Sequence, residues 1–234
     1  MLSAVIIARN EADRIVAAIE SVAFADEIIV LDSGSDDETV AVATAAGARV
    51  VRTDWPGFVA QKARAWAEAK GEWVLSIDAD ERVGTALRDE IREVLRAPTA
   101  NGYSVPRRNV WLGHALRHGH WYPDRKVRLA RQHSARWGGT DPHDVLVVSG
   151  PVSPLQNDLT HVPYRSLREH LDTIERYASI GARNGSLVDI AVRPVWHFFS
   201  GYILRLGFLD GVPGLMVACI GALGVLLKWS RARL

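Results

Sequence analysis

The chain has 234 residues, 48% hydrophobic and 24% charged, which is enough for one large α/β domain or for one domain with an appendage. Its 28 Lys and Arg residues nearly balance 27 Asp and Glu residues, and a net charge of +1 gives no global electrostatic argument for nucleic acid as a partner. The single cysteine, Cys219, excludes an internal disulfide and a multi-cysteine metal site, and it favours a reducing, cytoplasmic compartment.

The first part of the chain alternates short apolar runs with helical periodicity, which is typical of βαβ units and a parallel sheet. Met1 leads directly into strand-like residues without a basic segment or a cleavage site, so we expect no signal peptide. The expected strands are residues 5–7, 28–31, 50–51 and 73–77. The expected helices are residues 12–22, from Asp36 or Asp37 to Gly47, 59–69 and 85–95. The sequence therefore predicts an α/β fold, a mostly parallel sheet flanked by helices.

The character of the sequence changes after Pro98. Residues 103–105 and 127–129 have the pattern of strands, and they are separated by residues 106–123, which are rich in Gly, His, Arg and Trp. That stretch is too polar for a core, and we expect loops over a site. An amphipathic helix is expected over 167–178.

Polar residues follow three of the expected strands. They are Arg9, Asn10 and Glu11, then Asp32, and then Asp78 and Asp80. Ligands of open α/β sheets bind outside the carboxyl edge of the strands, so these side chains are expected to converge on one crevice. Asp78 and Asp80 alternate along an extended chain and could both reach one Mg²⁺ or Mn²⁺ ion, which would neutralise a departing nucleoside diphosphate. The alternative is that both aspartates cap the helix that follows.

Asp32 directly follows a strand, where a carboxylate can accept hydrogen bonds from a nucleotide base or ribose. Its alternative role is that of a turn-forming residue. The sequence has neither a Gly-x-Gly-x-x-Gly motif after the first strand nor a Gly-x-x-x-x-Gly-Lys-Ser/Thr motif. Phosphate must therefore be held by a metal and by side chains.

Several segments together resemble family 2 glycosyltransferases of the GT-A fold. They are Val5–Glu11, Asp32–Asp36, Trp55–Phe58, Gln61 with Lys62, and Asp78–Arg82. The resemblance extends over nearly the whole chain and is to the bacterial lipopolysaccharide core β-1,4-glucosyltransferase branch. The segments that extend it are Trp121–Asp124, Asp141–Asp144 and Gly207–Gly211.

This resemblance implies an inverting, metal-assisted transfer of glucose from UDP-glucose to a lipid-linked glycan such as inner-core heptose of lipopolysaccharide. By position, a set of residues is expected to bind the nucleotide sugar: Arg9, Asn10, Glu11, Asp32, Asp78 and Lys62. Lys62 would approach the diphosphate, and its alternative is a solvated helix position. Asp80 would be the principal metal ligand, assisted by Asp78. The chain departs from the pattern at Ala63, where relatives commonly have Asn.

Inversion by direct displacement needs a base that takes the proton of the acceptor hydroxyl. Asp144 is the first candidate, because His143-Asp144 stands where the resemblance leads us to expect His-Glu. Asp is shorter than Glu by one methylene, so Asp144 must either lie closer to the acceptor or leave the task to Asp141, the second candidate. The alternative is that both are turn residues. His143 is a candidate metal ligand. A zinc site at His114, His118 and His120 is disfavoured because no Cys partner accompanies them.

The loops are expected to bind the acceptor through Trp121, Tyr122 and Arg128. Arg binds phosphate in a bidentate manner, and aromatic faces stack on sugars, which suits an anionic glycan. The alternative is a solvated loop.

The C-terminal part is strongly apolar, and residues 211–227 carry no charge. As a helix they would span about 25 Å, less than a hydrocarbon core of about 30 Å, and Pro213 is expected to shorten the helix further. Flanking aromatic and basic residues favour a helix pair lying in the membrane interface; among them are Trp196, Phe199, Lys228, Arg231 and Arg233. The alternatives are a buried hairpin, a homodimer contact and a single span.

We thus expect a catalytic domain over 1–160, with a nucleotide-sugar half to about residue 97 and an acceptor half over 98–160, and a membrane-associating helical extension over 161–234. The protein is expected in the cytoplasm, peripherally bound to the inner face of the cytoplasmic membrane. Two other functions are considered. A sugar nucleotidyltransferase needs a Gly-rich basic loop after the first strand, which Ala8–Glu11 lacks. A non-catalytic membrane-associated interaction protein would be supported by degraded metal carboxylates, but both Asp78 and Asp80 are present. The sequence predicts no oligomeric state.

Overall fold

The computed structural model describes residues 1–141 and 143–231, so Pro142 of the Asp141–Asp144 segment and Arg233 of the basic C-terminal end lie outside the described residues. The chain divides into two compact units. The first comprises residues 1–107 and 125–161, and the second comprises residues 108–124 and those from 162 onward. The division after residue 161 falls beside the expected domain boundary, whereas residues 108–124 belong to the second unit.

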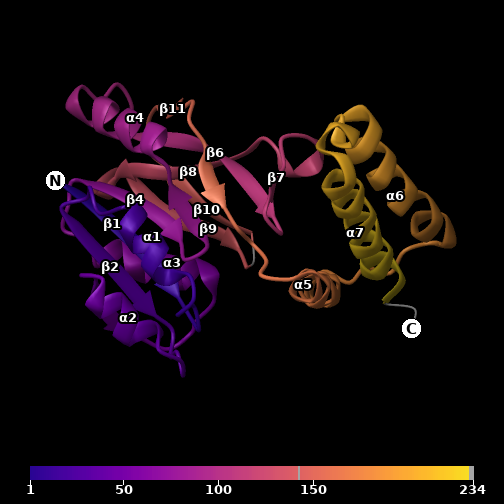
Figure 1. Cartoon of the computed structure of the whole chain (residues 1–234), viewed down its shortest axis with the longest axis horizontal. Coiled ribbons are helices and arrows are strands. Elements are labelled where there is room, and N and C mark those ends of the chain that lie inside the picture. The colour runs from indigo at the N-terminus through magenta and orange to yellow at the C-terminus, as the bar shows by residue number, and fades with distance from the viewer. Residues whose placement is uncertain (142, 232–234) are drawn as a thin grey trace. The chain divides into compact units, whose positions relative to one another are not determined.

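A curled, mixed sheet forms the first unit (Figure 1). Its strands follow the order β3-β2-β1-β4-β8-β6-β12-β5, and β11 pairs with β6. The neighbours β3, β2, β1 and β4 are parallel, whereas β8 is antiparallel to β4. The strands are β1 (Leu2–Ala8), β2 (Glu27–Asp32), β3 (Arg49–Arg52), β4 (Trp73–Asp78), β5 (Glu81–Val83), β6 (Gly102–Trp111), β8 (Asp124–Arg131), β11 (Val152–Pro154) and β12 (Leu159–His161).

Helices cover both faces of this sheet because its parallel strands are apolar on both sides. The helices are α1 (Ile15–Ser21), α2 (Thr39–Ala45), α3 (Phe58–Ala67) and α4 (Thr85–Arg96). Successive residues of β1 enter different cores: Ile6 packs in the cluster that contains residues of α1, α2 and α4, whereas Val5 packs with Ala65 and Trp66 of α3.

The predicted α/β class and the four predicted parallel strands are confirmed, as are the four helices between and after them. The helix-cap alternative for Asp78 and Asp80 is wrong, because β5 separates the pair from α4, whose N-cap is Gly84. The expectation of loops throughout residues 106–123 is also wrong. Strand β6 continues to Trp111, and burial of Asn109 and Trp111 explains why this polar stretch is ordered.

A separate two-stranded hairpin packs on α3 in the first unit. Its strands β9 (Ala135–Thr140) and β10 (His143–Val148) are antiparallel, with Thr140 opposite His143 and Gly139 opposite Asp144. Trp137 and Leu146 share a core cluster with Ala65 and Trp66 of α3, so the body of the hairpin is anchored by apolar burial. A short 3₁₀ turn, η2 (Gln132–Ser134), leads into it.

The second unit is mainly helical. It contains α5 (Leu167–Ile180), α6 (Leu187–Phe199) and α7 (Gly211–Ser230), and α7 packs against both α5 and α6. A π-helix, η3 (Ser200–Leu204), and a 3₁₀ helix, η4 (Gly207–Asp210), join α6 to α7. The remaining elements are β7 (His114–Ala115), paired with the end of β6, and the turn η1 (Gly119–Trp121). Pro213 does not shorten α7, because it lies in the first turn, where proline needs no hydrogen-bond partner.

A buried histidine organises the core of the second unit. The indole N–H of Trp111 donates to Nδ1 of His170 at 3.1 Å, and the ring of Tyr164 stacks on His170 with 4.2 Å between centroids. The imidazole must be neutral to accept this bond at Nδ1. Burial lowers the pKa of His170 to about 4, so the neutral form persists well below neutral pH.

Acidification should therefore destabilise the fold through His170. The unfolded chain has a histidine pKa of about 6.5 and takes up a proton first, so the free energy of unfolding should fall as the pH drops from about 6.5 to about 4, by about 2 kcal/mol. His170→Phe should lose this dependence, whereas the control His133→Phe, at an exposed position, should keep it. Urea unfolding at pH 7, 6 and 5 measures the slope; equal slopes for wild type and His170→Phe would contradict the assignment.

Candidate active site

The carboxyl ends of the parallel strands bring the expected polar segments to one edge of the sheet. Ala8 pairs with Asp32, and Ile7 pairs with Asp78, so the segments after β1, β2 and β4 leave the sheet side by side. This is the edge at which open α/β sheets bind ligands.

The segments after β1 and β2 are tied to one another. The amide of Asn10 donates to Ser35 Oγ at 2.9 Å, and the amide of Asp36 donates to Asn10 Oδ1 at 3.0 Å. Asp32 is fully buried, and its carboxylate accepts the amides of Gly34 and Ser35, each at 3.1 Å, as well as the Ser35 hydroxyl. Asp32 therefore shapes its own loop, in the manner of the turn-forming alternative.

Arg9 is exposed beside Asn10, and Glu11 is partly buried. Glu11 forms an ion pair with Arg14 at 3.0 Å, and its amide donates to the hydroxyl of Thr39 at 2.8 Å. Arg9 and Glu11 therefore lie at the edge of the sheet, in the segment that follows β1.

Asp78 lies between two buried cations, Lys62 and Arg128. Its Oδ1 is 3.0 Å from Lys62 Nζ, and its Oδ2 accepts a bond from the Arg128 guanidinium at 2.8 Å. Burial raises the pKa of Asp78, but the charges of Lys62 and Arg128 outweigh burial and hold that pKa well below its usual range. The carboxylate is consequently ionised.

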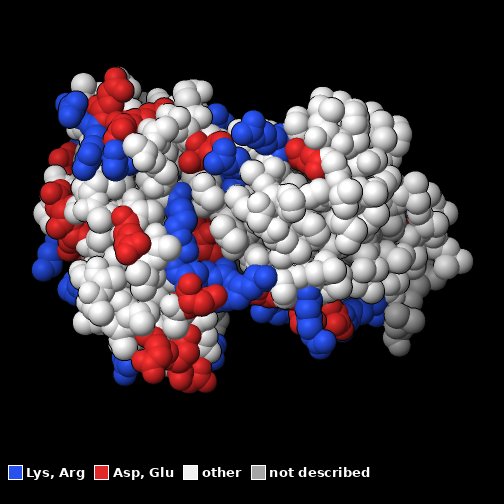
Figure 2. All heavy atoms as spheres, viewed as in Figure 1, with Lys and Arg blue, Asp and Glu red and all other residues white. Residues whose placement is uncertain are grey.

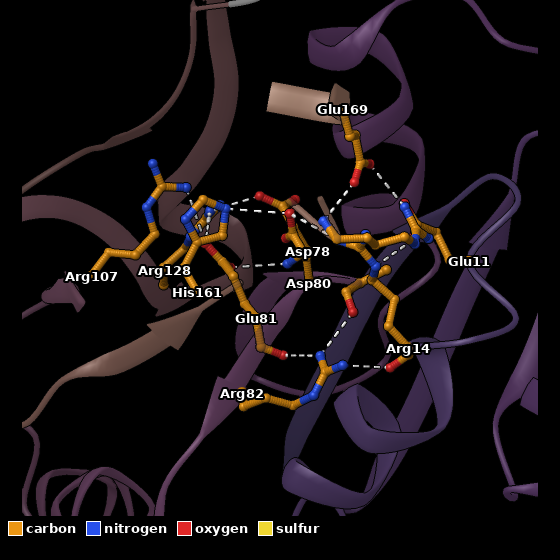
Figure 3. Close-up of polar contacts among 12 residues, drawn as sticks. Glu11, Arg14, Asp78, Asp80, Glu81, Arg82, Arg107, Arg128, His161 and Glu169 are labelled. Carbon is orange, nitrogen blue, oxygen red and sulfur yellow. Dashed lines mark hydrogen bonds and ion pairs between the residues drawn. The ribbon is translucent and has the colours of Figure 1, made fainter. Parts of the chain in front are cut away.

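Asp80 has a different set of neighbours from Asp78. Its Oδ2 lies 3.3 Å from His161 Nε2 and 3.8 Å from the Arg14 guanidinium (Figure 3). Burial raises the pKa of Asp80, but the hydrogen bond and charge of His161 bring it below its usual value. No local pattern in the sequence predicts a role for His161, which is brought to Asp80 by the pairing of β12 with β5.

The two aspartates retain acceptor capacity suited to a cation. Within residues 1–141 and 143–231, Oδ1 of Asp80 is buried and accepts no hydrogen bond. Oδ1 of Asp78 accepts none either, but it forms the ion pair with Lys62 at 3.0 Å. Buried carboxylate oxygens normally find a donor, and oxygen ligands are what Mg²⁺ and Mn²⁺ prefer. The described residues contain no preformed group of three or more His, Cys, Asp or Glu side chains placed to hold a metal. Among the described contacts, none joins His143 to Asp78 or Asp80. The donor set fits a hard cation completed by other oxygen ligands, such as those of a diphosphate.

Lys62 is buried, which rules out the solvated-helix alternative. Its ammonium contacts both Asp78 and Asp144, at 3.0 and 2.8 Å, and lies 5.0 Å from the centroid of the Trp137 ring. Helix α3 thus places one cation between the end of β4 and the hairpin β9–β10. The indole ring adds a cation–π contact to the two ion pairs.

The two candidate bases have different environments. The side chain of Asp144 is 14% exposed and bound to Lys62. Asp141 lies at the hairpin turn, and its carboxylate accepts the amides of Phe58 and Val59 at the start of α3, at 3.0 and 2.9 Å. Asp144 therefore faces the sheet edge beside Lys62, whereas Asp141 faces a helix terminus.

The three residues expected to bind the acceptor are not brought together within one unit. Arg128 is buried in the first unit and bonds Asp78 at 2.8 Å and Glu81 at 2.6 Å, so it is a partner of the acidic segment. Glu81 and Asp78 keep the pKa of Arg128 above its usual value, although burial lowers it. Trp121 and Tyr122 belong to the second unit.

Comparison with known proteins found a matching family model and several similar proteins. The family model described as "Glycosyl transferase family 2" matches residues 3–148. A glycosyltransferase of Rickettsia bellii is 31% identical over 99% of this chain and 86% of its own length. The lipopolysaccharide core biosynthesis glycosyltransferase LpsC of Rhizobium meliloti is 30% identical over 98% of this chain and 91% of its own length.

A solved structure of glucosyl-3-phosphoglycerate synthase from Mycobacterium tuberculosis, in complex with Mn²⁺, UDP and glucosyl-3-phosphoglycerate, is 30% identical, with a TM-score of 0.39. The match covers 48% of this chain and 44% of that chain. The predicted resemblance is confirmed by the family match and by the near full-length similarity to LpsC. The chain belongs to glycosyl transferase family 2.

Proposed function

We propose that this glycosyltransferase moves glucose from UDP-glucose, with inversion, to a sugar of a lipid-linked glycan such as inner-core heptose of lipopolysaccharide. The observation that supports it best is the pair of ionised aspartates, Asp78 and Asp80, beside the buried cation Lys62 at the carboxyl edge of the sheet, with one buried oxygen of Asp80 that accepts no hydrogen bond. The choice of acceptor is supported by the similarity to LpsC.

Asp80 and Asp78 would hold a Mg²⁺ or Mn²⁺ ion, and such an ion acts as a Lewis acid that stabilises the departing diphosphate. Asp80 is the better ligand, because Asp78 already serves Lys62 and Arg128. His161 is close enough to orient Asp80. Arg128 we assign to holding Asp78, in place of the acceptor contact expected from the sequence.

The nucleotide part of the donor would lie over the segments that carry Arg9, Asn10, Glu11 and Asp32. Lys62 would reach the diphosphate from α3. Asp144, beside Lys62, would take the proton of the acceptor hydroxyl, because it is the carboxylate that stands near the proposed diphosphate site. Trp121 and Tyr122 would supply faces on which acceptor sugars stack.

A donor panel tests the central proposal. Purified protein incubated with UDP-glucose, other nucleotide sugars and a heptose-containing core oligosaccharide should release UDP only in the presence of Mg²⁺ or Mn²⁺, and mainly from UDP-glucose. Release is followed by a coupled assay for nucleoside diphosphate, and the anomeric configuration of the product by NMR. Absence of binding and turnover with every donor, with and without metal, would refute the proposal.

Replacement of Asp80 by Asn should lower metal-dependent transfer by about 100-fold or more, because an amide is a poor ligand for a hard cation. The control Asp89→Asn removes an exposed carboxylate of α4 paired with Arg88 and should keep full activity. Mn²⁺ binding followed by electron paramagnetic resonance should weaken only in Asp80→Asn. Full activity and unchanged Mn²⁺ binding in that variant would remove Asp80 from the metal site.

The outer face of α6 supports the proposed membrane contact. Val188, Val192, Val195 and Phe199 recur at helical spacing and are all exposed, and Trp196 adjoins them. The apolar surface continues around the turn between α6 and α7 through exposed residues, namely Ile203, Leu204, Leu206, Phe208, Leu209 and Val212. Figure 2 shows few charged side chains over α6 and α7.

Helix α7 is partly packed within its own unit. The segment Gly207–Ser230 is long and apolar enough to cross a membrane by length and composition only. Within the second unit, however, Ile220, Met216 and Val217 of α7 pack with Trp111 and Leu116. We therefore propose that the face of α6 and the turn lie in the membrane interface, flanked by Arg205, Lys228 and Arg231, while α7 supports them from behind.

Charges placed on the apolar face should release the protein from lipid. Val195→Glu with Phe199→Glu should weaken binding to vesicles of phosphatidylglycerol and phosphatidylethanolamine by about tenfold or more, because burying a carboxylate in the interface is unfavourable. The control Val152→Glu, on exposed β11 of the first unit, should bind like wild type. Vesicle flotation measures binding. Unchanged flotation would exclude this face as the membrane contact. A dimer in light scattering that the double substitution dissociates would show instead that a second copy covers this face.

A further inference from the structure

The turn of the hairpin β9–β10 contacts the first turn of α3 through one side chain. Oδ2 of Asp141 accepts the amide of Phe58 at 3.0 Å, and Oδ1 accepts the amide of Val59 at 2.9 Å. Amides in the first turn of a helix have no partner within the helix, and the positive end of the helix dipole favours a carboxylate. Asp141 therefore serves as an N-terminal cap of α3 that is supplied from 82 to 83 residues away.

Gly57 makes this approach possible. It has φ +107°, and a Cβ atom built on it would lie 2.0 Å from Oδ2 of Asp141. A side chain at this position would displace the carboxylate in addition to straining the backbone. The absence of a side chain at Gly57 is thus what leaves room for the carboxylate of Asp141.

The same helix and hairpin meet again one turn further along α3. Lys62 lies three residues after Val59, and Asp144 lies three residues after Asp141, and these two side chains are joined at 2.8 Å. Residues 59 and 62 lie on one face of a helix, so both contacts act along the same line. The apolar packing of Trp137 and Leu146 against α3 anchors the hairpin body, and Asp141 is the contact that anchors its turn.

We propose that Asp141 is a positioning residue whose carboxylate fastens the hairpin to the start of α3 and so holds Asp144 against Lys62. This inference rests on the proposed function, in which Asp144 takes the acceptor proton. Both oxygens of Asp141 are occupied by main-chain donors at the helix terminus, which leaves the proton transfer to Asp144. A base has to be within hydrogen-bond reach of its proton, and a displacement of about 1 Å can cost about 100-fold in rate.

Kinetics of Asp141 variants across a range of pH test the assignment. Asp141→Asn, which keeps one acceptor oxygen, should lower kcat by about tenfold, and Asp141→Ala should lower it by about 100-fold, with the donor KM and the shape of the pH profile unchanged. Asp144→Asn should abolish the limb of the profile that reports the base. The control Glu90→Gln alters a carboxylate that accepts the amides of Gln156 and Asn157 at 2.7 and 2.9 Å, away from the site, and should keep wild-type kcat.

A second pair of variants displaces the carboxylate without removing it. Gly57→Ala should lower kcat as Asp141→Ala does. Gly47→Ala, at φ +89° with no atom within 4 Å of the added methyl, carries the same kind of backbone strain and should keep kcat. Wild-type kcat in both Asp141→Ala and Gly57→Ala would overturn the assignment. Loss of the acidic limb, which reports the ionisation of the base, in Asp141→Asn, with that limb retained in Asp144→Asn, would make Asp141 the base instead.

Hydrogen–deuterium exchange separates this inference from the proposed function. Amides of residues 58 and 59 should be protected in the wild-type protein and should exchange at least tenfold faster in Asp141→Ala, whether or not any donor is turned over. Unprotected amides in the wild type would disprove the tie itself. An inactive wild type with protected amides would refute the proposed reaction and leave the tie established.

Discussion

The buried ammonium of Lys62 is the constraint on which the candidate site depends. Removing such a charge from water costs several kcal/mol unless carboxylates compensate it, and a pair that loses one partner is strongly destabilised. Lys62 obtains its compensation from Asp78 at the end of β4 and from Asp144 on the hairpin. Two consecutive elements, α3 and β4, and a hairpin residue 82 positions after Lys62 must therefore meet at one nitrogen atom, and their relative position follows from that requirement.

The charges around this nitrogen divide the acidic residues into two groups. Asp78 and Glu81 face buried cations, Lys62 and Arg128, with Arg107 completing the set at 3.3 Å from Glu81. Asp80 faces a histidine and a more distant guanidinium. A cation that enters the site competes with fewer charges at Asp80 than at Asp78, which is why the roles of two aspartates only two residues apart separate. Spacing alone leaves the pair equivalent. The resemblance made Asp80 the expected principal ligand, and the neighbours supply a physical reason for that proposal.

The parts of the fold that the sequence predicts are those fixed by local patterns. Continuous apolar runs indicated β1, β2 and β4, and the glycine and polar residues that follow them indicated the edge at which Asp32 and Asp78 emerge. The prediction of loops over residues 106–123 was wrong because burial of Trp111 in the second unit, a tertiary effect, extends β6 through a polar stretch. The prediction that Pro213 shortens the C-terminal helix was wrong because the effect of a proline depends on where the helix begins, and α7 begins at Gly211.

Contacts between distant segments were beyond prediction from one sequence. Lys62 was expected at the diphosphate from the resemblance, but no local signal in α3 predicts its burial or its contact with Trp137, which lies 75 positions later. His161 reaches Asp80 only because β12 pairs with β5. The turn position of Asp141 could have predicted that its carboxylate accepts main-chain amides, because aspartate in a turn commonly does so. The sequence does not indicate which amides these are, since Phe58 and Val59 lie 83 and 82 positions earlier.

The hairpin differs from the rest of the site in how it is held. The aspartates after β4 are fixed by a sheet whose strands are paired on both sides, so their positions vary little with any single side chain. Strands β9 and β10 pair only with each other among the described residues, and side chains alone set their position against α3. The part of the site proposed to bind the donor is thus built into the backbone of the fold, whereas the position of Asp144 depends on Lys62, Asp141 and the packing of Trp137. Substitutions that alter the hairpin can therefore change the rate of transfer without altering how the sheet edge presents its carboxylates.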